Sequence, residues 1–212
     1  LRLWQSAQLG SGAAQNLSND ASFDMLNYAQ SYFDREGVIV AIKDGEQIGF
    51  VHAGFGCSTT GHDLDPESGV ICALIVHPEH RRQGIGRELV QRAEQYLRGR
   101  GAKQICAGPG PGRDPFYFGL YGGAKPVGFL DSDVAAAPFF SAIGYLPIER
   151  YTLTTRAMSA RDPINFKVTM IRRKYELVLC DRPEPCPWWW MVRYGRLDAL
   201  FCVLMPKGGQ GK

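Results

Sequence analysis

The chain has 212 residues, of which 45% are hydrophobic and 21% are charged, so it is long and apolar enough to bury a core of its own. Its 24 basic and 21 acidic residues give a formal net charge of +3, which is too small to indicate a nucleic-acid-binding protein. The six cysteines lack the paired spacing of a zinc site or a small disulfide scaffold, so we expect reduced thiols and no metal site.

Membrane and export signals are absent from the sequence pattern. No segment forms a long uncharged run able to span a bilayer, and the first residues do not resemble a signal peptide. These features predict a soluble cytoplasmic protein with no membrane and no nucleic-acid partner. The sequence does not distinguish a monomer from a homodimer.

The first third of the chain predicts short helices followed by a β-hairpin. Apolar residues recur at helical spacing from Ser18 to Phe33, which fits one or two short helices. The apolar runs 38–42 and 48–53 flank Asp44-Gly45, a pair that favours a tight hairpin turn. The stretch 56–69 is rich in turn-forming residues and predicts a loop.

A buried strand expected over 70–76 leads through a basic loop into an amphipathic helix. Gly84 and Gly86 would let backbone N–H groups approach a ligand closely, and the helix start directs its unpaired N–H groups to the same point. Arg81 and Arg87 add charge suited to phosphate oxygens, although both could instead be solvated charges at a helix start. The stretch therefore predicts a cradle for an anion.

The remaining elements alternate strands and helices. Residues 103–107 predict a short strand, and the glycine- and proline-rich run 108–112 must turn the chain away. A helix is expected over 133–143, ended by Gly144, and a strand over 145–155.

Two motifs resemble those of the GNAT superfamily of N-acetyltransferases. The loop reads Arg81-x-x-Gly84-x-Gly86 after Leu74-x-Val76-x-Pro78, which is similar to the acyl-CoA signature Arg/Gln-x-x-Gly-x-Gly/Ala. Residues 139–145 resemble the later family motif Phe-Tyr-x-x-x-Gly-Phe. The resemblance implies an α/β GNAT fold, in which helices flank a mixed, mostly antiparallel central sheet. It covers roughly residues 1–156, which we interpret as the N-acetyltransferase domain.

The resemblance implies an acyltransferase that moves an acetyl group from acetyl-CoA directly to an amine acceptor. The pantetheine arm would lie between the strand ending at Val76 and the strand ending near Ala107, with the pyrophosphate over the amides of the glycine loop. The cofactor-binding residues implied are Leu74, Ile75, Val76, Arg81, Arg82, Gln83, Gly84, Ile85, Gly86 and Arg87.

The catalytic groups are less clearly indicated. Phe140 stands where the family motif has a tyrosine that protonates the CoA thiolate, and phenylalanine has no proton to give. Tyr145, Tyr117, Tyr121 or water could replace it, with Tyr145 our first choice. His52 and Glu67 are candidate general bases, and His52 could equally be a packing residue. The alternative is a module that binds acyl-CoA without catalysis.

The chain beyond residue 157 exceeds a minimal GNAT domain. It predicts extra β segments over 166–180 and 188–205, separated by a proline-rich break. We interpret 157–212 as a β-rich extension. It is either the start of a degenerate or truncated second GNAT domain or a ribbon that covers the first domain. In the first case the chain could be the structural half of a tandem protein whose other half does the chemistry. Neither reading identifies the acceptor. Tyr117 and Asp114, with Tyr121 and other acidic residues, suggest a cationic small molecule or peptide amine.

Overall fold

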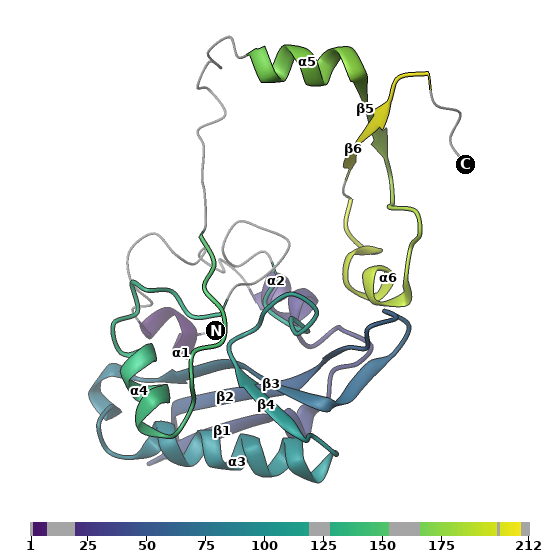
Figure 1. Cartoon of the computed structure of the whole chain (residues 1–212). Coiled ribbons are helices and arrows are strands. Elements are labelled where there is room, and N and C mark those ends of the chain that lie inside the picture. Colours follow the sequence, from purple (N-terminus) through teal and green to yellow (C-terminus); the bar gives the residue numbers. More distant parts are fainter. Residues whose placement is uncertain (1, 8–19, 119–127, 153–165, 199, 209–212) are drawn as a thin grey trace. The chain divides into compact units, whose positions relative to one another are not determined.

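The computed structural model describes residues 2–7, 20–118, 128–152, 166–198 and 200–208 (Figure 1). The chain divides into two compact units, residues 1–149 and residues 150–212. Each unit has its own sheet, and the two are described separately.

The first unit contains a four-stranded mixed sheet in the order β1-β2-β3-β4. Its strands are β1 (Val38–Lys43), β2 (Glu46–Cys57), β3 (Leu64–Val76) and β4 (Gln104–Ala107). The first three strands pair antiparallel, and β4 runs parallel to β3. The mixed, mostly antiparallel sheet with flanking helices confirms the predicted fold class (Figure 1).

The hairpin between β1 and β2 forms as predicted. Asp44 and Gly45 have φ values of 52° and 83°, the left-handed conformations that a tight two-residue turn requires. The predicted loop over 56–69 is wrong, because β2 continues to Cys57 and β3 begins at Leu64, where the two residues pair. Only residues 58–63 form the connection. The prediction was too long because exposed strand ends carry the same polar residues as a loop.

Helices cover both faces of this sheet (Figure 1). On one face, α3 (Ile85–Gly99) inserts a stripe of buried residues that includes Leu89, Ala93 and Leu97. The amphipathic pattern of the sequence predicted this helix and its end at glycine. On the other face, α1 (Arg2–Ser6) and α2 (Asp20–Leu26) contribute to a second core cluster through Leu3, Trp4 and Phe23.

The segment after β4 is less regular than the sequence suggested. The helix α4 spans Ala136–Ala142, three residues shorter at its start than predicted, and Gly144 follows it with φ 94°. The strand predicted from Tyr145 is not present over 145–152, the part that the structure describes. Leu146 and Ile148 are 83% and 67% exposed, so this apolar alternation packs against no sheet in the described chain, and Pro147 could not donate to one.

The described residues of the second unit form two helices and a two-stranded antiparallel sheet. The helix α5 (Phe166–Lys174) precedes β5 (Tyr175–Cys180), and α6 (Trp188–Tyr194) precedes β6 (Phe201–Pro206). The extra C-terminal strands are therefore present, but two stretches predicted as strand are helical. Apolar runs of this length do not separate helix from strand, and α6 instead sets consecutive tryptophans about 100° apart around its axis.

Three further properties follow from the described residues. None of their helices is both long and apolar enough to cross a membrane. They contain no group of three or more His, Cys, Asp or Glu side chains that could hold a metal ion. All six cysteines are free thiols.

Short 3-10 turns complete the first unit. One, η1 (Arg35–Gly37), leads into β1, and the other, η2 (Pro78–His80), follows β3. The side chain of Asp34 caps η1 by accepting a hydrogen bond from the N–H of Glu36 at 2.9 Å.

Candidate functional site

A bulge interrupts β3 near the middle of the sheet. Ala73 pairs with His52 and Ile71 pairs with Ala53, so Cys72 is an extra residue without a partner on β2. Cys72 and Ala73 consequently pack into the same core cluster, on the face of α1 and α2. A bulge of this kind shifts the alternation along the strand by one residue. After it, side chains point to the opposite face of the sheet, and backbone groups point to the opposite neighbouring strand, from those that an uninterrupted strand would give.

The hydrogen bonds on either side of the bulge show this exchange. Before it, the carbonyl of Ile71 accepts from the N–H of Gly108 at 2.9 Å, on the side of β4. After it, the N–H of His77 donates to a β2 carbonyl at 2.8 Å. Because backbone groups alternate along a strand, Leu74 and Val76 direct theirs away from β2, toward the side of β4.

That side of β3 is open beyond the bulge. The parallel pairing with β4 covers only Ser68 to Ile71 and ends at Ala107. Gly108, with φ 86°, then turns the chain out of the sheet, and among the described residues no further strand pairs there (Figure 1). In the part of the chain that the structure describes, the residues from Cys72 to Val76 therefore present a strand edge that no other strand pairs with, at the place where the GNAT resemblance implies a gap.

The glycine loop follows directly on this edge. Arg82 and Gly84 adopt left-handed conformations, with φ values of 62° and 83°, and α3 begins after Gly84. The first N–H to bond within this turn is that of Glu88, which donates to the Gly84 carbonyl at 3.1 Å. The N–H groups of residues 85–87 precede it and have no acceptor within the helix. They form, with the positive end of the helix dipole, a site suited to an anion.

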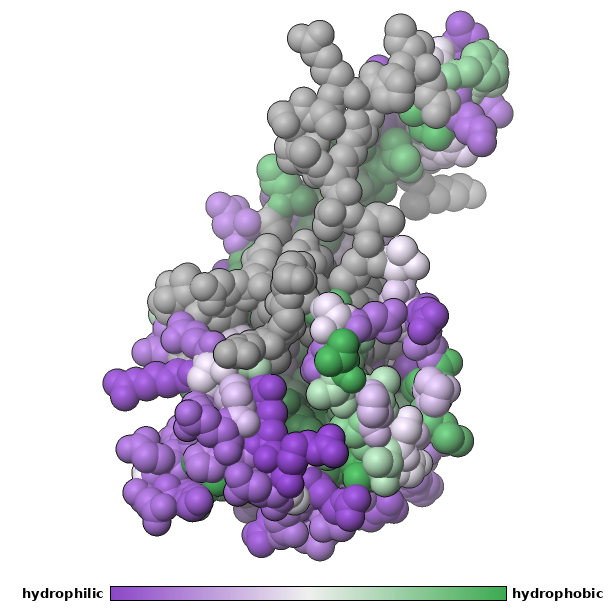
Figure 2. Space-filling view, turned by 90° about the vertical axis from the view of Figure 1, so that its left-hand side faces the viewer, coloured by the Kyte–Doolittle hydropathy of each residue, from purple (hydrophilic) through white to green (hydrophobic). Residues whose placement is uncertain are grey.

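The basic residues of the loop divide into two kinds. Arg81 ties the loop to the fold, because its Nε donates to the Val76 carbonyl at 2.9 Å and its Nη2 donates to the Ala7 carbonyl at 2.6 Å. Arg82 and Arg87 are exposed. Figure 2 looks onto the unit from the end where β3 meets the loop, and hydrophilic residues there lie beside a smaller group of hydrophobic ones. Arg81 is thus held by two carbonyls, and no local sequence pattern predicts either contact.

The helix α4 lies beside the glycine loop. A Cβ at Gly86 would lie 3.3 Å from the ring of Phe139 and 3.8 Å from the side chain of Val76, so α4 packs over the start of α3. Phe140 is buried and stacks on Phe129 with ring centroids 4.6 Å apart. The position at which the family motif has a tyrosine is therefore apolar and closely packed.

Tyr145 lies next to Phe140, with ring centroids 5.4 Å apart. Its hydroxyl donates to Oε1 of Glu94 on α3 at 2.7 Å. Burial and the charge of Glu94 raise the pKa of Tyr145, so the hydroxyl stays protonated; Cys106 of β4 is among the neighbouring groups that influence this pKa. Tyr145 packs against the same core cluster as Ile105 and Ala107 of β4.

His52 occupies the interior of the sheet. It is fully buried, its Nδ1 lies 3.0 Å from the Tyr117 hydroxyl, and its ring is 4.2 Å from that of Phe116. Its Nε2 is buried and finds no hydrogen-bond partner among the residues that the structure describes. Burial lowers the pKa of His52 to about 3, because the charged form would lose its hydration. Its side chain is neutral and shielded from solvent.

Glu67 lies at the other end of β3. Its side chain is exposed and forms an ion pair with Lys103. Seven residues of extended strand, about 23 Å at roughly 3.3 Å per residue, separate it from Leu74. The structure does not bring Glu67 to the open strand edge.

Of the remaining acceptor-site candidates, Tyr117 and Asp114 are internal, whereas Asp131 is exposed and Asp133 is half-buried. Tyr117 and Asp114 are 3% and 1% exposed, so neither side chain faces a bound acceptor. Burial raises the pKa of Tyr117, whose backbone N–H also bonds to the side chain of Asn27. Tyr121 lies outside the described residues.

The mixed sheet, the opened third strand and the glycine loop that follows it have the architecture of the GNAT fold. A model of the family described as "Acetyltransferase (GNAT) family" matches residues 13–120, about half of the chain. The protein therefore belongs to the GNAT acetyltransferase family.

Individual relatives are more distant. An "Uncharacterized N-acetyltransferase" of Archaeoglobus fulgidus is 39% identical over 84 residues, which are 38% of this chain and 54% of the relative. The chain thus spans about half the length of that relative.

Solved structures of similar fold include aminoglycoside N-acetyltransferase AAC(6')-Iy in complex with CoA, with 17% identity and a TM-score of 0.39 over 56% of this chain and 73% of that one. Another is aminoglycoside acetyltransferase meta-AAC0020 from an uncultured soil metagenomic sample, in complex with trehalose. It has 14% identity and a TM-score of 0.47 over 74% of this chain and 85% of that one.

Proposed function

We propose that this protein transfers an acetyl group from acetyl-CoA directly to an amine acceptor. The observation that carries the proposal is the continuity of two features: an unpaired strand edge from Cys72 to Val76 and a glycine loop whose helix start is open to an anion. An extended amide-bearing chain that ends in a pyrophosphate, as CoA does, matches both.

The ten cofactor residues expected from the GNAT resemblance act in this proposal in different ways. Leu74 and the N–H of Val76 offer backbone groups to the pantetheine amides, while the Val76 carbonyl is held by Arg81 and Ile75 pairs with β2. The amides of residues 82–86 face the pyrophosphate, while Ile85 anchors α3 in the core. Arg87 supplies charge at the phosphate, and Arg81 fixes the loop through its bonds to two carbonyls.

The transfer itself needs two bond changes at the thioester carbon and two proton transfers, one at the amine and one at the CoA sulfur. The amine nitrogen attacks the thioester carbonyl carbon, the carbon–sulfur bond breaks, and the amine proton leaves while the CoA sulfur takes up another. A backbone N–H of β3 that points into the gap would stabilise the developing oxyanion. No covalent enzyme intermediate is required.

Tyr145 is the proposed proton donor for the thiolate. Its hydroxyl is half-buried and has a raised pKa, to which Cys106 of β4 contributes, so it is protonated. The hydroxyl is bonded to Glu94 and must leave that carboxylate to reach the sulfur. His52 and Glu67 are still proposed as bases, and each has a requirement. His52 could act only through its hydrogen bond to Tyr117, or after the core opens. Glu67 could act only if it moved closer to the gap.

Calorimetric titration with acetyl-CoA tests the cofactor site. We expect saturable binding that Arg87→Glu weakens about tenfold, because losing one phosphate contact and adding a repulsive charge costs about 1.4 kcal/mol. Arg98→Glu makes the same charge change at the exposed far end of α3 and should alter affinity less than twofold. If the unchanged protein fails to bind acetyl-CoA, or if both variants bind equally, the proposed site is wrong.

A screen for CoA release with amines tests the transfer. We expect turnover with cationic small molecules or peptide amines. Reaction with neutral or anionic amines alone would discard the cationic class without affecting the cofactor site.

Two observations favour a second candidate, a module that binds acyl-CoA without efficient transfer. Phe140 places a stacked ring where the family motif has a hydroxyl, and His52 is sealed in the core. The two candidates differ in the effect of Tyr145→Phe on single-turnover acetyl transfer. For the enzyme we expect at least a tenfold lower rate with unchanged acetyl-CoA affinity. Affinity for acetyl-CoA without measurable transfer to any amine would support the module.

A further inference from the structure

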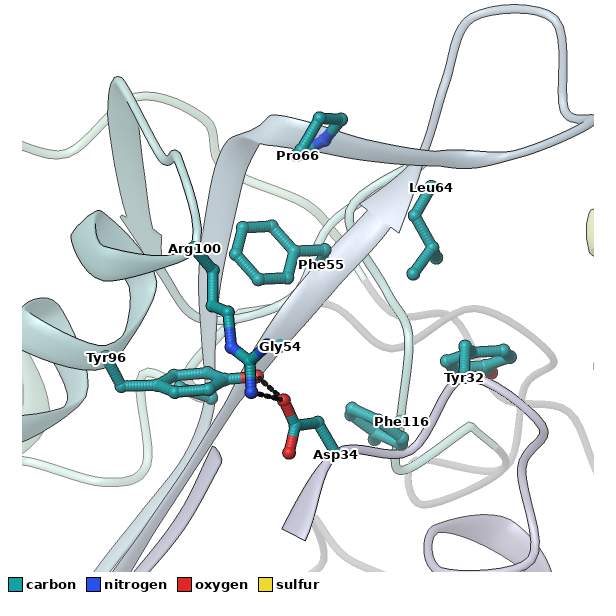
Figure 3. A pocket seen from close by; sticks show the side chains of 10 residues that line it. Tyr32, Asp34, Gly54, Phe55, Leu64, Pro66, Tyr96, Arg100 and Phe116 are labelled. Atoms are coloured by element: carbon teal, nitrogen blue, oxygen red, sulfur yellow. Dashed lines mark hydrogen bonds and ion pairs between the residues drawn. The ribbon is translucent and has the colours of Figure 1, made fainter. Parts of the chain in front are cut away.

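A pocket of about 270 Å³ lies at the end of α3 that is remote from the glycine loop (Figure 3). Its lining comes from several separate parts of the first unit, among them Tyr32, Gly54 on β2, Leu64 on β3, Arg100 after α3, and Phe116. The fifteen residues of α3 separate it from the loop by about 22 Å, at roughly 1.5 Å per residue. The proposed acetyl-CoA site therefore does not use this pocket.

The walls of the pocket are apolar and fixed by the fold. Phe55, Leu64 and Phe116 face the space, together with the ring of Tyr32 (Figure 3). A Cβ at Gly54 would lie 2.7 Å from the ring of Phe116, so only glycine lets this ring lie against the strand. The Tyr32 hydroxyl donates to the carbonyl of residue 115 at 2.6 Å and so holds its ring in place. Such pre-formed walls favour binding because little side-chain motion must be lost.

One end of the pocket is polar. Oδ2 of Asp34 accepts a hydrogen bond from the Tyr96 hydroxyl at 3.1 Å and forms an ion pair with Nη2 of Arg100 at 2.8 Å (Figure 3). The same Nη2 lies 2.8 Å from Oε2 of Glu36. Burial and Asp34 raise the pKa of Tyr96, so its hydroxyl remains a donor. The charges at this end already have partners within the protein.

We propose that this pocket binds a small uncharged aromatic molecule that carries one hydroxyl group. The aromatic and aliphatic walls suit a flat ring, and the volume is below the roughly 300–1,000 Å³ of pockets for drug-sized ligands. A hydroxyl both donates and accepts, so at the polar end it can donate to Asp34 and accept from Arg100. A charged ligand would have to compete with the Asp34–Arg100 ion pair for its partner.

Ligand-observed fluorine NMR with 4-fluorophenol tests the proposal on the full chain. We expect a dissociation constant of about 1 mM or tighter, a range within reach of a ligand of this size. The anion 4-fluorobenzoate and the cation 4-fluorobenzylamine should bind at least tenfold more weakly. Equal binding of all three, or no binding of the phenol, overturns the proposal.

Two variants locate the binding. Leu64→Trp fills the pocket and should weaken 4-fluorophenol binding at least tenfold, whereas Ile42→Trp, at a residue 65% exposed on β1, should leave it unchanged. Arg100→Gln keeps the walls but removes the ion pair at the exposed polar end, and should weaken binding about fivefold without unfolding the protein. Binding that neither pocket variant changes would place the ligand elsewhere and overturn the proposal.

Discussion

His52 shows how one buried side chain links the core to pH. Its ring packs against Phe116 and Phe33, and its Nδ1 is bonded to Tyr117, so the folded protein holds it neutral with a pKa of about 3. In the unfolded chain the same imidazole has a pKa of about 6.5. Between these values the unfolded state binds a proton that the folded state excludes. The free energy of unfolding therefore falls as the pH falls below about 6.5.

His52→Gln removes this titration while keeping a side chain able to bond to Tyr117. Each pH unit below 6.5 costs about 1.4 kcal/mol, so the unchanged protein should lose about 2 kcal/mol more than the variant between pH 7.5 and pH 5.0. Urea unfolding at both pH values measures the difference. Equal losses in the two proteins would show that His52 is accessible to protons in the folded state, as a general base must be.

At the scale of a single element, α3 has a glycine at each end, and the two glycines differ in backbone conformation. Gly84 precedes the helix with φ 83°, a conformation that side-chain-bearing residues rarely adopt, and a Cβ there would meet no atom. Gly99 is the last helical residue, and a Cβ there would also meet open space. The two sites thus differ in backbone conformation and not in crowding.

We therefore expect alanine to have opposite effects at the two ends. Gly84→Ala should lower the free energy of unfolding by about 1 kcal/mol through left-handed strain, and Gly99→Ala should raise it by about 0.5 kcal/mol through helix propensity. Urea denaturation of both variants gives the comparison. A stabilised Gly84→Ala would mean that the loop relaxes out of the left-handed conformation.

The elements also show where sequence reasoning succeeds. The hairpin at Asp44-Gly45 and the glycine loop before α3 follow from local conformational preferences, and the structure has both. The bulge at Cys72 depends on the pairing of β3 with β2, which no local pattern reveals. The same reason explains the helices found at Phe166 and Trp188, because short apolar runs fit either periodicity until their packing partners are known. The Arg81 contact with Ala7 joins residues 74 positions apart.

At the scale of the whole molecule, the two hydrophobic core clusters belong to the first unit alone. Among the described residues, both are built from side chains between Leu3 and Tyr145, all of them within residues 1–149. The second unit has one two-stranded sheet, and five of its β5 and β6 apolar side chains, Tyr175, Leu177, Leu179, Val203 and Leu204, are exposed. An isolated two-stranded sheet is marginally stable at best.

A fragment of residues 1–149 should therefore fold and carry the cofactor site by itself. We expect a single cooperative thermal transition and an acetyl-CoA dissociation constant within twofold of the full chain, because the open strand edge and the glycine loop lie inside the fragment. Circular dichroism and calorimetry measure both. A fragment of residues 150–212 should show no cooperative transition. If residues 1–149 fail to fold, or bind acetyl-CoA more than tenfold more weakly, the C-terminal unit completes the acetyltransferase domain, and a ribbon that covers the first domain becomes the better description of it.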